Sequence, residues 1–253
     1  MPNGEGTGVC VVVPCYNEAA RLNVDAFRHY LAHTELTRLI FVDDGSKDET
    51  LTILKRLCWD LEDKTEVLAC EANSGKAEAV RRGMMHALRV HRPEMVGFWD
   101  ADLATPLDDI DCFHGLLRGR SELEMVFGSR VKLLGRHIER KAARHYLGRI
   151  FATVVSTMLE LPIYDTQCGA KLFRVTEGTR EIFADRFLSK WVFDVEIIAR
   201  YQRLYRASGK KLETAIYEYP LECWVDVAGS KVKPRDFVTA LVDVARIKSK
   251  YLP

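Results

Sequence analysis

Two aspartates separated by one residue, Asp100 and Asp102, are the strongest chemical signal in the sequence. They follow the apolar run 95–99, which has the length and composition of a buried strand. Side chains at positions i and i+2 of an extended segment point to the same side, so both carboxylates can face one ligand. Such a pair suits Mg²⁺ or Mn²⁺ bridging a nucleotide diphosphate, because water and phosphate oxygens fill the remaining positions. Aspartate is also common in ordinary turns, so the pattern alone decides little.

Two earlier strands are also predicted to end in polar residues that could contact a nucleotide. Pro14 ends the first strand, Tyr16 and Glu18 follow it, and Asp43 and Asp44 follow the second strand. An aromatic face and a carboxylate can contact a nucleoside, and adjacent carboxylates at a buried strand end need hydrogen-bond donors. The first segment alone is equally compatible with an ordinary strand-to-helix turn, and in the second turn Asp44 and Asp48 could serve only to organise the backbone. In the second turn we expect Asp48 only to organise the backbone.

Strand and helix signals alternate through the first half of the chain. The predicted strands cover residues 9–14, 38–42, 66–69 and 95–99, and the predicted helices cover residues 24–34, 48–61 and 76–90. This alternation predicts an α/β fold with a mostly parallel, Rossmann-like sheet and helices on both faces. Ligands bind such sheets beyond the carboxyl ends of the strands, where the three polar segments should meet. Ser46 and Glu49 have the spacing of a capping box for the second helix.

The second half is less regular, but nothing in it divides the chain. Strands are predicted at residues 125–129 and 212–219, and helices at residues 141–159, 194–205 and 234–250. No linker rich in proline, glycine and serine separates them, so residues 1–253 are predicted to form a single domain. Residues 1–8 are polar and rich in glycine, and we expect them to be flexible.

The composition argues against several classes of protein. The net charge is +1, so no global positive field indicates nucleic-acid binding. Seven cysteines without a C-x-x-C pair indicate free thiols in a reducing compartment. His86 and His91 lie five residues apart, which is not the i, i+4 spacing of metal ligands, so we expect them to be structural or exposed. With neither a signal peptide nor an apolar run of about 20 residues, we expect a cytoplasmic protein, at most peripheral on the inner face of a membrane.

Four segments together resemble the inverting family 2 glycosyltransferases, which have a GT-A fold. They are residues 13–18, 42–50, 73–77 and 100–102. Later segments are similar to the dolichyl-phosphate sugar synthases of that family, namely residues 128–130, 165–173, 191–196 and 229–232. The ordered set spans nearly the whole chain. The resemblance therefore implies a metal-dependent hexosyltransferase that uses a nucleotide sugar.

The resemblance also implies roles for individual residues. Pro14, Tyr16, Glu18 and Asp43 would hold the base and ribose of the donor, and Asp44 and Lys76 would lie near the nucleotide. Asp100 would support the ribose or the metal, and Asp102 would bind the Mg²⁺ or Mn²⁺ ion. Stabilisation of the leaving diphosphate by that ion would be the largest catalytic contribution.

The residues after Asp102 bear on the identity of the donor. Ala104 stands where mannose synthases usually carry a glutamine that can help to hold the metal. The D-x-D-x-A-T pattern is more similar to dolichyl-phosphate glucosyltransferases. The resemblance therefore implies UDP-glucose as the donor and a polyprenyl or dolichyl phosphate as the acceptor, with a GDP-mannose-using mannosyltransferase as an alternative.

A basic segment indicates an anionic acceptor independently of the resemblance. Residues 130–149 carry a net charge of +6 in a chain whose total is +1. A solvent-exposed helix face is the usual meaning of such a run, but this one lacks compensating acids and follows the Gly-Ser-Arg motif. By the resemblance, Arg130 and Arg144 would bind the acceptor phosphate. Arg149 could replace a serine that is often found at the position of Gly148.

Asp194 bears on the choice between two kinds of acceptor. A phosphomonoester has its second pKa near ~6, so it is ionised at neutral pH and needs no general base. A sugar hydroxyl needs a carboxylate base, and Asp194 matches the region where hydroxyl-using relatives keep one. It could also cap the helix that follows. A family 2 enzyme with a glycan or small-metabolite acceptor, and a non-catalytic protein that keeps the fold, are the remaining alternatives.

The C-terminal helix is expected to pack on the core, and membrane contact is a second hypothesis for it. Phe237, Leu241, Val244 and Tyr251 fall on one side, and Arg246, Lys248 and Lys250 lie near the end of the helix. Three basic residues contribute about 3 kcal/mol of attraction to anionic lipid. That is too little for stable anchoring, so a lipid substrate or a partner would have to supply the rest.

Overall fold

The computed structural model describes residues 8–139, 142–226 and 234–252, with the side chains of 142–147 and 234–238 left out. The first half alternates strands and helices, as predicted. Its elements are β1 (Val9–Cys15), α1 (Val24–His33), β2 (Thr37–Asp43), α2 (Thr50–Asp60), β3 (Thr65–Ala69), α3 (Lys76–Val90) and β4 (Met95–Trp99). β1, β2 and β4 each end next to one of the three polar segments that the sequence predicts.

The second half contains more elements than the sequence predicts. They are α4 (Asp109–Gly119), β5 (Met125–Ser129), β6 (His137–Glu139), α5 (Ala142–Leu159), β7 (Ala170–Arg174), α6 (Glu177–Ala184), α7 (Phe193–Ala207), η1 (Leu212–Thr214), β8 (Ile216–Pro220), β9 (Cys223–Val225) and α8 (Pro234–Tyr251). The predicted strand 212–219 is wrong in its first part, because residues 212–214 form a short 3₁₀ helix before β8 begins.

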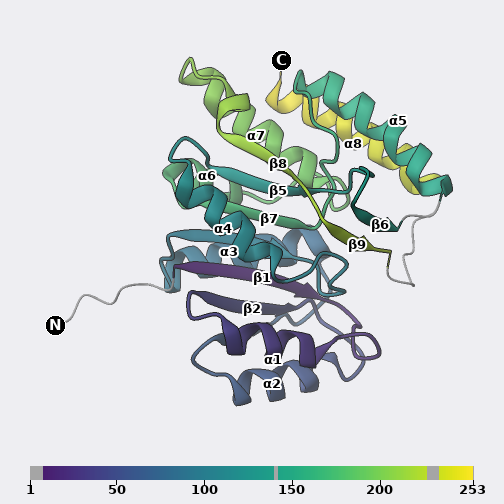
Figure 1. Ribbon diagram of the computed structural model, residues 1–253. Coiled ribbons are helices and arrows are strands. Elements are labelled where there is room, and N and C mark those ends of the chain that lie inside the picture. The colour runs from purple at the N-terminus through teal and green to yellow at the C-terminus, as the bar shows by residue number, and fades with distance from the viewer. Residues whose placement is uncertain (1–7, 140–141, 227–233, 253) are drawn as a thin grey trace.

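The central sheet has seven strands in the order β3-β2-β1-β4-β7-β5-β8 (Figure 1). β1 to β4 are parallel, β5 is parallel to β8, and β7 runs antiparallel to both of its neighbours. The prediction of a mostly parallel sheet is therefore confirmed. β6 and β9 form a separate two-stranded parallel sheet.

Helices cover both faces of the central sheet, as the nearly continuous apolar strands require. α1, α2 and α4 contribute to one hydrophobic cluster, and α3, α5, α6, α7 and α8 contribute to the other. Successive residues of β1 alternate between the two clusters, with Val11 in the first and Val12 in the second. α5 and α8 lie side by side on the outside of the second layer (Figure 1).

Helix α3 is held close to the sheet by a glycine. A Cβ atom at Gly83 would lie only 2.4 Å from Cγ1 of Val12 and 2.9 Å from Cγ2 of Val42. Glycine inside a helix costs about 1 kcal/mol relative to alanine, and here it permits the close approach. The start of α3, which carries Lys76, is thereby fixed near the carboxyl ends of β1 and β2.

The predicted capping box at the start of α2 is wrong. The helix begins at Thr50, and Glu49 makes no capping hydrogen bond with its side chain. The hydroxyl of Ser46 instead accepts a hydrogen bond from the backbone N–H of Asn17 at 3.0 Å. Oδ1 of Asp48 accepts from the N–H of Thr50 at 3.0 Å, so Asp48 organises this turn as predicted.

Candidate active site

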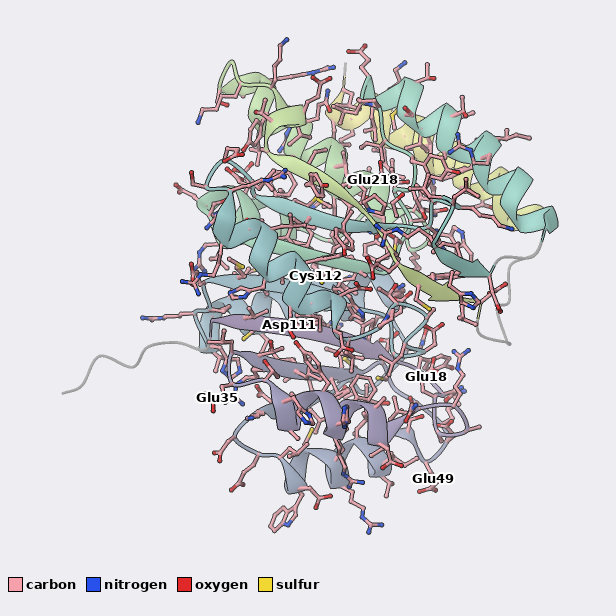
Figure 2. All side chains as sticks on the ribbon, in the orientation of Figure 1. Glu18, Glu35, Glu49, Asp111, Cys112 and Glu218 are labelled. Carbon is pink, nitrogen blue, oxygen red and sulfur yellow. The ribbon has the colours of Figure 1, made fainter. Side chains whose placement is uncertain are left out.

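The polar turns after β1, β2 and β4 meet at one edge of the sheet. Burial raises the pKa of the Cys15 thiol, and the charges of Glu18 and Asp43 raise it further. The hydrogen bond to Glu18 raises the pKa of Arg21, and Asp102 adds to that shift. These interactions bring residues 18, 43 and 102 into one electrostatic neighbourhood. Figure 2 shows Glu18 at this edge, with Glu35 at the opposite one.

Hydrogen bonds fasten the first two turns to each other. Asn17 has a left-handed backbone with φ of 54°, which an asparagine tolerates. Its Oδ1 accepts from the N–H of Lys47 at 2.8 Å, and the N–H of Glu18 donates to Oγ1 of Thr50 at 2.8 Å. The two turns therefore form one rigid platform at the end of β1 and β2.

Asp43 presents an unsatisfied acceptor at this edge. The residue is 1% exposed, and its Oδ2 accepts from the N–H of Ser46 at 3.3 Å. Its Oδ1 is buried and has no hydrogen-bond partner among the described residues. Leaving a buried polar atom unpaired costs about 1–3 kcal/mol, so a ligand that donates a hydrogen bond here would be stabilised.

The other predicted donor-binding residues of the first turn differ in how accessible they are. Pro14 lies inside β1, opposite Val42, and the strand continues to Cys15, so the prediction that Pro14 ends the strand is wrong by one residue. Tyr16 is 37% exposed, so its ring is accessible to a ligand. Glu18 is buried, and its Oε1 accepts a hydrogen bond from Nη2 of Arg21 at 2.5 Å. Glu18 therefore holds a cation that the sequence alone did not single out.

Asp44 fixes the loop that leads into α3. Its Oδ1 accepts from the N–H of Ser74 at 2.9 Å, and its Oδ2 accepts from the N–H of Gly75 at 2.7 Å. Gly75 has φ of 94°, a conformation that favours glycine. Asp44 thereby positions Lys76, the first residue of the helix.

Lys76 lies among the carboxylates that follow β4. Its ammonium group forms an ion pair with Oδ1 of Asp100. Burial alone would lower the pKa of Lys76, but the charges of Asp100 and Asp194 raise it above the usual value, and Asp102 adds to that effect. The structure therefore gathers three acids around one lysine, although segments far apart in the sequence contribute them.

The carboxylates of Asp100 and Asp102 fit a divalent cation. Burial raises the pKa of Asp102, and the charge of Asp100 raises it further, so the two groups repel each other. Oδ1 of Asp102 accepts from the N–H of Ala104 at 3.1 Å. Two adjacent carboxylates form a hard oxygen donor set of the kind that Mg²⁺ and Mn²⁺ prefer, and such an ion would relieve their repulsion.

The Asp100 side chain packs against the backbone of Gly169, the residue before β7. The N–H of Asp100 donates to the carbonyl of Gly169 at 3.0 Å. A Cβ atom at Gly169 would lie 1.9 Å from Oδ2 of Asp100, so any side chain there would displace the carboxylate. Gly169 therefore determines where Asp100 sits.

Asp194 pairs with a buried lysine instead of capping a helix. α7 begins at Phe193 and its N-cap residue is Val192, so the predicted capping role is wrong. Oδ1 of Asp194 accepts from Nζ of Lys171 at 2.6 Å, and Nζ also donates to the carbonyl of Cys168 at 2.6 Å. Lys171 is fully buried. This pair joins β7 to the start of α7 beside the carboxylate cluster.

Arg130, one of the predicted acceptor residues, is held by an acid. Its Nη2 and Nε donate to the two carboxylate oxygens of Asp165 at 2.8 Å and 2.5 Å. Its guanidinium carbon lies 5.2 Å from the centre of the Trp224 ring. Burial would lower the pKa of Arg130, but Asp165 raises it, and the charge of Asp100 contributes. Arg130 therefore lies within electrostatic range of the carboxylate cluster.

Arg149, a second predicted acceptor residue, reaches the same short segment. Its guanidinium carbon lies 3.7 Å from the centre of the Tyr164 ring, which is a cation–π contact. The N–H groups of Tyr164 and Asp165 donate to the carboxylate of Glu218 at 2.8 Å and 2.6 Å. Arg130 and Arg149 thus contact adjacent residues of one segment. The side chain of Arg144 lies outside the described residues.

Sequence reasoning missed several residues that shape this site. Arg21 lies three residues after Glu18, a spacing that could have indicated an ion pair. Lys171 is a lone cation in the apolar run 170–173, which indicates a buried partner. Asp165 begins the segment 165–173 that resembles the family, but the partners of Asp165 and Glu218 could not be predicted, because they lie far away in the sequence.

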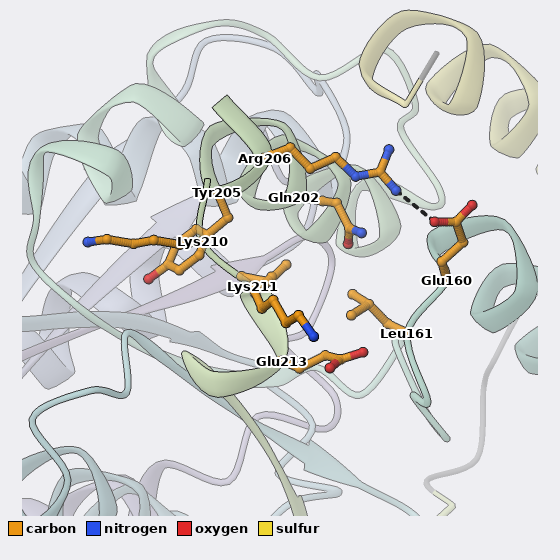
Figure 3. Close-up of a pocket in the computed structure, with 9 residues that line it drawn as sticks. Glu160, Leu161, Gln202, Tyr205, Arg206, Lys210, Lys211 and Glu213 are labelled. Carbon is orange, nitrogen blue, oxygen red and sulfur yellow. Dashed lines mark hydrogen bonds and ion pairs between the residues drawn. The ribbon is translucent and has the colours of Figure 1, made fainter. Parts of the chain in front are cut away.

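A separate pocket lies at the carboxyl end of α7, whereas Asp194 lies at the start of that helix (Figure 3). It has a volume of about 230 Å³ and lies between the end of α5, the last turns of α7 and η1. Arg206 pairs with Glu160 at its rim, with an Nη2–Oε2 distance of 2.9 Å. None of the predicted site residues lines this pocket, so it is not the place where the polar turns meet.

Comparison with known proteins agrees with this arrangement. The family model for glycosyl transferase family 2 matches residues 10–130. A dolichyl-phosphate beta-glucosyltransferase of Mus musculus is 34% identical over 88% of this chain and 69% of its own length. One of Dictyostelium discoideum is 32% identical over 96% and 74%. The chain belongs to glycosyltransferase family 2.

A solved structure supports the fold of this family 2 glycosyltransferase. The crystal structure of glucosyl-3-phosphoglycerate synthase from Mycobacterium tuberculosis, in complex with Mn²⁺ and UDP-glucose, superposes with a TM-score of 0.66. The two sequences are 19% identical, and the match covers 97% of this chain and 79% of the other. The GT-A fold is therefore confirmed.

The lengths and compositions of the helices bear on whether this glycosyltransferase could span a membrane. In the part of the chain that the structure describes, none of them combines the length and the apolar composition that crossing a bilayer requires.

Proposed function

We propose that the protein transfers glucose from UDP-glucose to a polyprenyl phosphate of the dolichyl type. The observation that carries this proposal is the cluster of Asp100, Asp102, Asp194 and Lys76 at the carboxyl end of β4. It lies in a chain similar to dolichyl-phosphate beta-glucosyltransferases. A nucleotide diphosphate needs such a site, because its charge must be balanced while the bond to the sugar breaks.

The base and ribose of the donor would lie on the platform made by the first two turns. The unpaired Oδ1 of Asp43 can accept a hydrogen bond from an N–H on the edge of uracil. The exposed ring of Tyr16 can stack on the base, and Pro14 fixes the end of β1 beneath it. Glu18 holds Arg21 near the carboxylates, where the arginine can contact the diphosphate.

Asp102 and Asp100 would hold the Mg²⁺ or Mn²⁺ ion. When bound, the ion supplies positive charge to the diphosphate and stabilises the leaving nucleotide. Lys76 holds Asp100 by its ion pair and places a second positive charge near the same diphosphate. Asp44 keeps Lys76 in place through its two hydrogen bonds to the preceding loop.

The acceptor phosphate would approach from the side of the arginines. Arg130 and Arg149 contact the segment 164–165, and Arg144 belongs to the same basic stretch of the sequence. Arginines position a phosphate and reduce its repulsion from the donor diphosphate. A phosphate oxygen then forms a bond to the anomeric carbon while the bond from that carbon to UDP breaks. The single displacement converts an α-linked donor into a β-linked product.

A panel of donors and acceptors tests the proposal. UDP- and GDP-sugars, including GDP-mannose, are incubated with and without a short polyprenyl phosphate, and nucleotide release and product mass are recorded. The proposal expects UDP release from UDP-glucose that depends on the lipid phosphate. If GDP-mannose were the only sugar nucleotide from which nucleotide is released, the donor would be GDP-mannose and not UDP-glucose. If nucleotide release required a hydroxyl acceptor, the acceptor would not be a lipid phosphate.

Asp194 distinguishes the two kinds of acceptor. An attacking phosphate needs no general base, so Asp194→Asn, which keeps an acceptor for Lys171, should retain activity within about tenfold. A hydroxyl acceptor would lose roughly 10²–10⁴-fold with its base removed. Thermal unfolding of the variant checks that the buried contact with Lys171 survives.

We further propose that the enzyme works at the cytoplasmic surface of a membrane, where its lipid acceptor resides. Exposed apolar side chains on the adjacent helices α5 and α8, namely Ile150, Val154 and Val242, support this contact. The exposed Lys248 and Lys250 complement anionic lipid. All seven cysteines carry thiols rather than disulfides, which is typical of a reducing compartment.

A further inference from the structure

Three potential metal ligands converge at the end of α3 that is remote from Lys76. Glu66 comes from β3, His86 comes from α3, and His91 is the residue that caps the carboxyl end of that helix. With a rise of about 1.5 Å per residue, His86 lies roughly 15 Å along the helix from Lys76. The cluster is therefore separate from the carboxylates that face the donor.

The two histidines, which the sequence predicts to be structural or exposed, are both partly buried and share one acidic partner. Helix α3 ends at Val90, and its C-cap residue His91 keeps a right-handed helical backbone, with its N–H donating to the carbonyl of Ala87 at 3.0 Å. The His91 ring comes within 5.8 Å of the His86 ring, centre to centre. Both rings lie against the same glutamate on the edge strand of the sheet. A spacing of five residues therefore places two imidazoles on one carboxylate.

The distances are close to those of a metal site. Oε1 of Glu66 lies 2.9 Å from Nε2 of His86, and Oε2 lies 2.8 Å from Nε2 of His91. One ligand atom from each residue falls within 4.8 Å of the other two. Zinc bonds of about 2.0–2.1 Å place tetrahedral ligand atoms roughly 3.3 Å apart, so small side-chain rotations would complete the geometry.

The ring nitrogen of His86 supports a ligand role. Its Nε2 is buried and makes no aligned hydrogen bond among the described residues, although Oε1 of Glu66 lies only 2.9 Å away. This nitrogen therefore faces a carboxylate oxygen at short range without an aligned hydrogen bond, and a cation bound by both atoms would satisfy them together. The three side chains remain between 17% and 31% exposed, so an ion and a water ligand can reach them.

We propose that Glu66, His86 and His91 bind one Zn²⁺ ion, with solvent in the fourth position. Two imidazoles and one carboxylate favour Zn²⁺ and its transition-metal relatives, whereas the Asp100–Asp102 pair favours the harder Mg²⁺ and Mn²⁺. The zinc ion would tie the edge strand β3 to the end of α3. The proposal does not depend on the transferase reaction.

Cobalt titration of the full chain tests the site, with excess Mg²⁺ present to occupy the carboxylate pair. Co²⁺ in a site of two imidazoles and a carboxylate gives visible d–d bands without a thiolate charge-transfer band. We expect one equivalent to bind, Zn²⁺ to displace it, and the double variant His86→Asn/His91→Asn to bind at least about tenfold more weakly. Glu66→Gln should weaken binding without lowering the unfolding temperature in EDTA.

Two control variants test whether the cobalt spectrum could come from another site of the molecule. His29→Asn/His33→Asn removes an exposed histidine pair whose rings lie 4.5 Å apart, and Asp102→Asn alters the carboxylate pair. Both should keep the full cobalt spectrum. Absence of the bands in the unmodified protein, their survival in the His86/His91 variant, their loss in either control, or a thiolate band would each overturn the proposal.

Discussion

At the scale of single residues, Asp102 is the carboxylate of the proposed donor site whose negative charge is least well compensated. It is half-buried next to Asp100, and both burial and that neighbour raise its pKa. The surrounding cations, Lys76 and Arg21, belong to other ion pairs. Asp102 is therefore suited to bind a divalent cation that enters the site together with the nucleotide diphosphate.

Asp102→Asn should reduce turnover by about 10²–10³-fold, the typical cost of removing one stabilising group from a developing charge. The volume of the side chain is unchanged, so folding should not be affected. Steady-state rates with saturating Mg²⁺ or Mn²⁺ measure the loss. Asp108→Asn, at an exposed aspartate nearby, is the matched control and should keep full activity. Full activity of the Asp102 variant would remove it from the mechanism.

Asp109 makes stability depend on pH. Burial raises its pKa from 3.8 to about 6, and the charges of Glu222 and Asp108 contribute. The folded protein therefore holds this proton more tightly than the unfolded chain does. The free energy of unfolding should fall as the pH rises from about 4 to about 6. Above about pH 6 the destabilisation caused by the ionised Asp109 should stay constant.

Asp109→Asn should remove that cost. Two pKa units correspond to at most about 3 kcal/mol, so we expect the variant to gain about 1–3 kcal/mol at pH 7. At about pH 3 and below, where the acid is largely protonated in both states, the gain should vanish. Urea unfolding at both pH values measures it. An equal gain at both would mean that the charge of Asp109 is not responsible.

At the scale of elements, the contact between α3 and β1 depends on the absence of a side chain. Gly83→Ala should destabilise the protein by about 1–2 kcal/mol, because overpacking outweighs the gain in helix propensity. A Cβ atom at Gly115 in α4 would lie in open space, so Gly115→Ala should stabilise by up to about 1 kcal/mol. Urea unfolding of both variants should give opposite signs, and stabilisation by both would contradict the close approach.

The sequence predicts the first four strands and three helices because their apolar periodicity is strong. β7 escaped prediction because Lys171 stands inside its short apolar run, and the lysine is tolerated there because it pairs with Asp194 and donates to the carbonyl of Cys168. α4 did carry a signal, since Ile110, Phe113 and Leu117 are buried at helical spacing. That element could have been predicted from the sequence.

At the scale of the whole molecule, topology explains why the candidate site was partly predictable. Parallel strands end at one edge, so Asp43 and Asp102 had to meet once the alternation of elements was known. The pairing of Arg130 with Asp165 joins segments 35 residues apart through the reversed strand β7, and no local pattern specifies that contact. The ion pairs on the acceptor side of the site therefore could not be predicted from the sequence.

The outer helices bear on membrane contact. Val244 and Tyr251 of α8 are buried and Leu241 packs partly buried against the same core, so core packing is confirmed for these three residues. The side chain of Phe237 lies outside the described residues. Neutralising Arg246, Lys248 and Lys250 should remove about 3 kcal/mol of attraction to anionic vesicles, which is roughly 100-fold in binding. Cosedimentation with anionic and neutral liposomes measures it. Unchanged binding to anionic vesicles would reject a membrane role for the end of α8.

The product of one turnover tests the central claim most directly. The protein is mixed with UDP-glucose labelled at the anomeric carbon, a short polyprenyl phosphate and Mg²⁺ or Mn²⁺, and the product is examined by NMR. We expect a β-configured glucosyl phosphate on the lipid and one UDP for each glucose transferred. An α-configured product, or glucose found only on water or on a hydroxyl acceptor, would contradict inverting transfer to a phosphate.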